Sequence, residues 1–183
     1  KFNQGDSDAQ ELKRQEREAQ VNDQLKKIRA DLKSQIDQGL ANVEKMGDQI
    51  LIQLSAQGSF QSGYAQLRAN FLPTLAEVAG TISSSNGKIT VSGHTDNIPI
   101  TKRLAKQWYN QTNLRLSSAR ALSVVEFWSS NSCNEYDLPL ELKQEWFTTV
   151  GIGEFSPIAN NKTPEGRRKK SGTKMNQNLT AIA

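Results

Sequence analysis

Hydrophobic residues in the first quarter of the chain recur mostly at steps of three and four, from Leu12 to Met46. This stretch contains no proline, and its only glycine is Gly39. The spacing predicts one long helix from about residue 8 to residue 46, with a narrow apolar stripe and otherwise charged faces. Such a stripe rarely holds a helix in place by itself. We therefore expect it to pack against a second copy or against the following domain, a solvated spacer helix being the alternative.

After Gly47, short apolar runs alternate with segments of helical spacing. Strands are expected at 49–54, 88–93 and 146–151, and helices at 68–84 and 113–131, the second with Asn113 as its N-cap. Residues 97–112 between them read as a long polar loop. Helices that connect successive strands favour parallel neighbours, so the pattern predicts one layer of helices on one sheet, an α+β or α/β fold.

Composition divides the 183 residues into three parts. Residues 1–47 are expected to form a charged linker helix, residues 48–170 a folded domain, and residues 171–183 a disordered basic and polar tail. The formal charge is +4, but residues 162–183 alone carry six basic and one acidic side chains, so the basic character belongs to the tail. These charges form a short run without interleaved aromatic residues, which argues against nucleic acid as a partner.

The sequence offers little for catalysis or for a cofactor. Cys133 is the only cysteine, which excludes an internal disulfide and a cysteine-based zinc site. His94 is the only histidine and has no second ligand at metal spacing, so it is interpreted as a structural residue. We expect no enzyme activity, no metal and no cofactor. No run of about 18 apolar residues is present, and we expect any targeting or membrane segment to lie outside this chain.

A possible binding site comes from Asp96, which follows the strand at 88–93, and Arg120, which lies in the helix that opens at Asn113. A carboxylate that takes an ammonium and a guanidinium that takes a carboxylate would together clamp a small zwitterion. A structural salt bridge between the two side chains is the alternative.

Four ordered motifs carry a family resemblance. Thr95-Asp96 followed by Asn113, Leu116, Ser117, Arg120 and Ala121 resembles the T-D…N-x-x-L-S-x-x-R-A signature of OmpA-like peptidoglycan-binding domains. Residues 60–65 resemble the family's F-x-x-G-x-A, and residues 151–167 resemble its G-x-G-x-x-x-P…N-x-T-x-x-G-R. The long segment between Asp96 and Asn113 is similar to that of flagellar stator proteins of the MotB/PomB type, the sodium-driven branch in particular.

The resemblance implies an OmpA-like β/α/β/α/β fold, α+β in class, with helices on one mixed sheet and a linker helix in front. It implies a non-catalytic periplasmic domain of a single-pass inner-membrane protein that binds the diaminopimelate of peptidoglycan. The expected partners are peptidoglycan, a second copy in a homodimer, a MotA/PomA-type channel subunit and periplasmic flagellar ring proteins. The alternative is a dimerisation or scaffold module of an envelope protein; a wall-modifying hydrolase is a further reading that the residues do not favour.

The resemblance also assigns roles to individual residues. Asp96 would meet the ligand's ammonium and Arg120 a carboxylate, while Thr95 and Asn113 shape the loop. The remaining members of the expected ligand-binding set are Phe60 on the floor of the site, Leu116, and Arg167 at its edge.

One segment departs from the family pattern. The family usually continues G-R-x-x-N-R-R and then an apolar edge strand, whereas residues 166–178 lack the Asn, the Arg pair and a clear β pattern. We therefore expect the last strand to be absent, or replaced poorly by residues 179–182.

Overall fold

A computed structural model describes residues 4–83, 88–98, 100, 112–130, 135–136, 142–155 and 172–178. Within these residues one five-stranded sheet has the order β1-β2-β5-β3-β4. The strands are β1 (Ala41–Met46), β2 (Gln49–Ser55), β3 (Lys88–His94), β4 (Phe147–Gly153) and β5 (Gly172–Asn178). The β3–β4 pair is parallel and the other pairs are antiparallel. The sheet is therefore mixed, as the resemblance implies.

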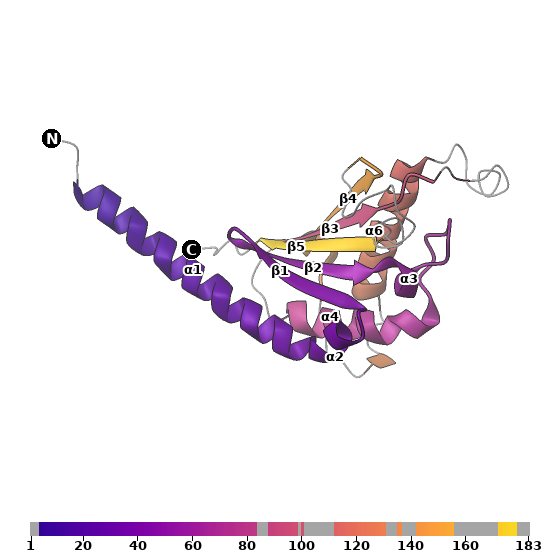
Figure 1. Cartoon of the computed structure of the whole chain (residues 1–183), viewed down its shortest axis with the longest axis horizontal. Coiled ribbons are helices and arrows are strands. Elements are labelled where there is room, and N and C mark those ends of the chain that lie inside the picture. The colour runs from indigo at the N-terminus through magenta and orange to yellow at the C-terminus, as the bar shows by residue number, and fades with distance from the viewer. Residues whose placement is uncertain are drawn as a thin grey trace.

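Helices cover one face of this sheet (Figure 1). They are α1 (Gln4–Asp31), α2 (Lys33–Asp37), α3 (Ala56–Ser59), α4 (Leu72–Ser83) and α6 (Asn113–Ser129), with short 3-10 turns η1 (Ala69–Phe71) and η3 (Gln144–Trp146). Apolar side chains from the strands and helices form a single core, which includes Ile50, Ile52, Phe71, Leu75, Ile82, Ile89, Val91, Val124 and Trp128. This confirms the predicted α+β class, with one layer of helices on one mixed sheet.

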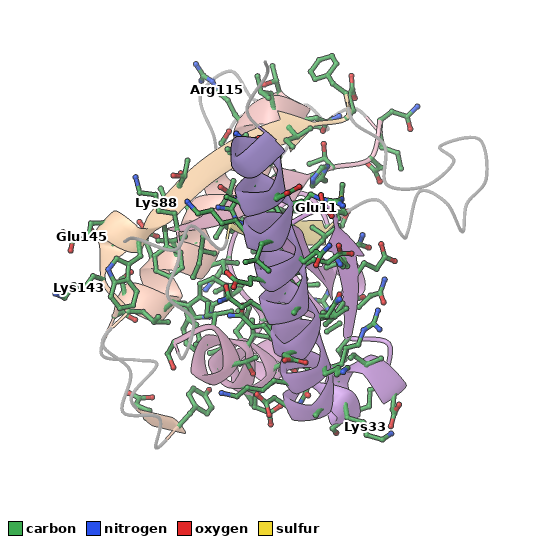
Figure 2. The ribbon with its side chains drawn as sticks, turned by 90° about the vertical axis from the view of Figure 1, so that its left-hand side faces the viewer. Glu11, Lys33, Lys88, Arg115, Lys143 and Glu145 are labelled. Atoms are coloured by element: carbon green, nitrogen blue, oxygen red, sulfur yellow. The ribbon has the colours of Figure 1, made fainter. Side chains whose placement is uncertain are left out.

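The two halves of helix α1 differ in how far their side chains are buried. Val21, Ile28 and Leu32, just beyond its end, are buried in the domain core, and the Arg29 guanidinium donates to the carbonyl oxygen of Val43 at 2.9 and 3.1 Å. Residues 8–20 are all exposed. Figure 1 shows these turns extending beyond the sheet, and Figure 2 shows the helix lengthwise, with Glu11 near its free end. The second half of the stripe thus packs against the following domain.

The predicted helix up to residue 46 is wrong over its last part. Helix α2 ends at Asp37, and Gly39 follows with a positive φ of 68°. The N–H of Gly39 donates to Ile36 and that of Leu40 donates to Gln35, which is the Schellman arrangement that ends a helix. Residues 41–46 then form β1, because they also fit the alternation of buried and exposed residues that an edge strand requires.

The predicted disordered tail is also wrong at residues 172–178. These residues form β5, which pairs with both β2 and β3 and so lies in the middle of the sheet. The register pairs Met175 with Ile52 on one side and with Val91 on the other. Backbone hydrogen bonds to two neighbours stabilise a strand whose own residues have weak strand propensity, and a local pattern does not report them.

Candidate ligand-binding site

The candidate site lies where the carboxyl ends of β3 and β4 meet the first turns of α6. The N–H of Thr95 donates to the carbonyl oxygen of Gly153 at 3.0 Å, which joins the segment after β3 to the end of β4. Because β3 and β4 are parallel, both strands end at the same edge of the sheet. This is the edge at which side chains from several segments of a parallel pair converge.

Glycines allow α6 to approach the sheet closely. An added Cβ at Gly93 would lie 1.9 Å from the carbonyl oxygen of Ser117, and one at Gly151 would lie 1.9 Å from Ser118 Oγ. Ser117 Oγ also accepts a hydrogen bond from the N–H of Gly153 at 2.9 Å. These contacts fix which face of α6 is turned toward the strand ends.

Arg120 is a buried cation on that face of α6, only 3 % exposed. Its Nε donates to the carbonyl oxygen of Tyr64 at 3.0 Å and its Nη2 to that of Gln61 at 3.4 Å. The guanidinium carbon lies 5.1 Å from the centre of the Phe60 ring, within cation–π range. Burial lowers the pKa of Arg120 to about 10, while the Asp96 carboxylate acts in the opposite direction. Arg120 therefore stays charged at neutral pH.

Asp96 lies within electrostatic range of Arg120 without direct contact. The ion pairs within 4.0 Å in the described part of the chain do not include these two residues. The Asp96 carboxylate is half-buried, and its Oδ1 accepts a hydrogen bond from the N–H of Ile98 at 3.2 Å. These charges have the signs that a ligand with one ammonium and one carboxylate requires.

Thr95 contributes a buried hydroxyl to the same edge. The residue is 4 % exposed, and its Oγ1 has no hydrogen-bond partner among the described residues. Leaving a buried hydroxyl unsatisfied costs about 1–3 kcal/mol. A polar ligand atom that reached Thr95 would remove this cost.

Asn113 joins three segments, one of which the sequence analysis missed. Its Nδ2 donates to Glu154 Oε2 at 2.8 Å and lies 3.2 Å from the carbonyl oxygens of Asp96 and Ile98. Glu154 was not among the predicted site residues, although its position directly after the G-x-G segment was a signal that could have found it. The N-cap prediction also shifts by one residue, because Thr112 Oγ1 accepts the N–H of Arg115 and Asn113 is the first residue of α6.

Residues 59–171 match the OmpA family. The chain belongs to this family. Motility protein B of Bacillus subtilis is 30% identical over 148 residues, which are 75% of this chain and 51% of that protein. The chain thus spans about half the length of this relative.

Two solved structures have a similar fold. The cell wall anchor of the T6SS from Pseudomonas aeruginosa superposes with a TM-score of 0.68 at 25% identity, over 84% of this chain and 97% of that one. A putative MotB-like protein from Desulfovibrio vulgaris superposes with a TM-score of 0.74 at 14% identity, over 92% and 96%. The second likeness shows the fold alone. Together the comparisons confirm the predicted resemblance to OmpA-like domains with MotB relatives.

The remaining predicted site residues are two buried side chains near Arg120 and one residue outside the described part of the chain. Phe60 is buried beneath the Arg120 guanidinium, and Leu116 is buried on α6 between Asn113 and Arg120. Arg167 lies outside the described residues, as do 101–111 of the predicted polar loop. The structure therefore brings together six of the seven predicted residues, and their role in binding stays a prediction.

The described residues offer no candidate site for a metal ion. The His, Cys, Asp and Glu residues among them form no group of three or more that could hold one. Among the helices of the same residues, none combines the length and the apolar character needed to cross a membrane.

Proposed function

We propose that this chain is a non-catalytic, periplasmic peptidoglycan-binding domain that anchors a flagellar stator subunit to the cell wall. The observation that carries the proposal is the edge at the ends of β3 and β4. There, Asp96 and Arg120 interact without touching, and the buried Thr95 hydroxyl lacks a partner among the described residues. Membership of the OmpA family supports it, as do a motility protein and a cell wall anchor among the relatives.

The ligand would be the diaminopimelate of the peptide stem. Its free end carries an ammonium, which suits the Asp96 carboxylate, and a carboxylate, which suits the Arg120 guanidinium. Exposed ion pairs contribute only about 0–1 kcal/mol each. Because Arg120 is buried and Asp96 half-buried, their contacts with a ligand would be less screened by water.

The wider assignment follows from the same proposal. The chain would be the periplasmic part of a single-pass inner-membrane protein that works as a homodimer with a MotA/PomA-type channel subunit. Periplasmic flagellar ring proteins would be further partners. Membership of the sodium-driven PomB branch stays a prediction, because the membrane helix that selects the ion would lie outside this chain.

A scaffold function is the second candidate, and one observation favours it. Arg120 donates to the carbonyl oxygens of Gln61 and Tyr64, so it contributes to the fold whether or not a ligand binds. Loss of binding in an Arg120 variant would therefore not distinguish the two functions. Asp96 is the better test, because its side chain is less buried and makes one local hydrogen bond.

We expect Asp96→Asn to lose most of its binding to peptidoglycan while keeping the fold. The substitution removes the charge that would attract the ammonium and keeps the shape of the side chain. The measurement is co-sedimentation of the purified chain with insoluble peptidoglycan, with circular dichroism and thermal unfolding as checks of the fold. We expect the pelleted fraction to fall about tenfold.

Asp48→Asn is the matched control, because Asp48 is exposed in the turn between β1 and β2 and the charge change is the same. It should pellet like the original chain. Equal pelleting of all three proteins would contradict the clamp and favour the scaffold function.

A further inference from the structure

The Asn113 side chain is surrounded on one side by oxygens that can only accept hydrogen bonds. These are the Glu154 carboxylate at 2.8 Å and the backbone carbonyls of Asp96 and Ile98, both at 3.2 Å. An amide group has one end with two N–H donors and one end that only accepts. Three acceptors on one side therefore require the nitrogen end of Asn113 to face them.

This arrangement determines where Asn113 Oδ1 points. The oxygen is bonded to the same carbon as Nδ2, so it is directed away from the three acceptors. None of the hydrogen bonds between described residues uses Oδ1 of Asn113. The oxygen is therefore an uncharged acceptor on the side of the amide opposite Glu154.

Glu154 is the strongest of the three acceptors. Its hydrogen bond is the shortest and is assisted by charge, and such bonds are about twice as strong as neutral ones. With one N–H of the amide bonded to Glu154, the backbone carbonyls of Asp96 and Ile98 share the other N–H. Glu154 is half-buried and follows Gly153, whose carbonyl oxygen accepts the N–H of Thr95. The carboxylate is thus placed by the same contact that joins β3 to β4.

We propose that Glu154 is a positioning residue that holds Asn113 with its oxygen toward the ligand. Asn113 Oδ1 and the Asp96 carboxylate then form an acceptor pair that selects a free, protonated amino group. This inference rests on the proposed function, because it assigns the ammonium half of the same site. It adds that the domain distinguishes a stem peptide with a free side-chain amine from one whose amine is acylated.

The test uses Glu154→Gln, which keeps the size of the side chain but removes its charge. Two muropeptides serve as probes, one whose diaminopimelate keeps its free amine and one whose amine is acetylated. Their dissociation constants are measured by calorimetry for the whole chain. We expect the original chain to prefer the free amine, and Glu154→Gln to reduce that preference about tenfold by weakening only the free-amine complex.

Glu145→Gln is the matched control. Glu145 is exposed and precedes β4, whereas Glu154 follows the same strand. Figure 2 shows Glu145 well separated from Arg115, which lies in the first turn of α6 beside Asn113. This control changes the net charge equally and should leave both dissociation constants unchanged.

A second measurement tests the route through Asn113. If Glu154 acts by orienting that amide, Asn113→Ala and Glu154→Gln should not add in the double variant. The side-chain NH₂ signals of Asn113 should also shift in the NMR spectrum of Glu154→Gln. Additive effects, or equal weakening of both muropeptides, would overturn the inference and leave the proposed function standing. Failure of the original chain to bind either muropeptide would overturn both.

Discussion

Arg120 shows how one residue can be needed for both stability and binding. Its guanidinium holds the backbone at Gln61 and Tyr64 and stacks on Phe60, yet it also provides the positive charge of the site. We expect Arg120→Ala to lower the free energy of unfolding by about 1–3 kcal/mol, because two carbonyl oxygens in a partly buried region lose their donors. Urea denaturation measures this loss. Arg17→Ala on the exposed part of α1 should leave the midpoint unchanged. Equal midpoints for the two variants would mean that the Arg120 hydrogen bonds do not stabilise the fold.

At the scale of elements, the contact between β3 and α6 depends on the absence of a side chain. A Cβ at Gly93 would lie 1.9 Å from the carbonyl oxygen of Ser117, and backbone cannot rotate away as a side chain can. We expect Gly93→Ala to destabilise the fold by about 3 kcal/mol or more, through overpacking between helix and sheet. Gly47→Ala is the comparison, since a Cβ there meets no atom within 4 Å and only the positive φ of 63° opposes it.

The Gly47→Ala cost should stay near 1 kcal/mol. Both values come from the midpoint and slope of chemical denaturation. A Gly93→Ala chain as stable as the Gly47→Ala chain would mean that α6 can move away from β3, and that the close approach is not required. In that case the placement of Asn113 and Arg120 would need another explanation.

At the scale of the whole molecule, the two ends of the chain are expected to contribute differently to the stability of the fold. Residues 172–178 fill the middle of the sheet, so a chain that ends at residue 170 would leave β2 and β3 without their common neighbour. We expect that chain to lack cooperative thermal unfolding. Removal of residues 1–17 should leave the melting temperature nearly unchanged, because the described side chains among them are exposed and the first core contact of α1 is Val21.

Calorimetry of the two truncated chains checks this contrast. A cooperative transition in the chain that ends at residue 170 would show that β5 is dispensable. A large loss of stability on removing residues 1–17 would show instead that the free half of α1 supports the domain.

Much of the site was accessible from the sequence because its parts are local. Residues 88–92 of β3 alternate polar and apolar side chains, α6 has helical spacing, and the motif residues follow one another along these elements. Asn113, Leu116 and Arg120 lie three and four residues apart, so any helix there places them on one face. Helix spacing and strand alternation depend on neighbours in the chain, and for this reason β2, β3, α4, α6 and β4 were all predicted close to their observed bounds.

The errors share one physical cause. Residues 41–46 fit both a helical stripe and an alternating strand, and pairing with β2 favoured the strand. Residues 172–178 are mostly polar and have weak strand propensity, yet two neighbouring strands stabilise them in the centre of the sheet. The Glu154–Asn113 bond joins residues 41 positions apart. The residue pattern was sufficient for the family, the class of fold and most of the candidate site. The strand order, the end of the first helix and the partners of Asn113 and Arg120 needed the folded chain, because they depend on contacts between segments whose separation in sequence carries no local signal.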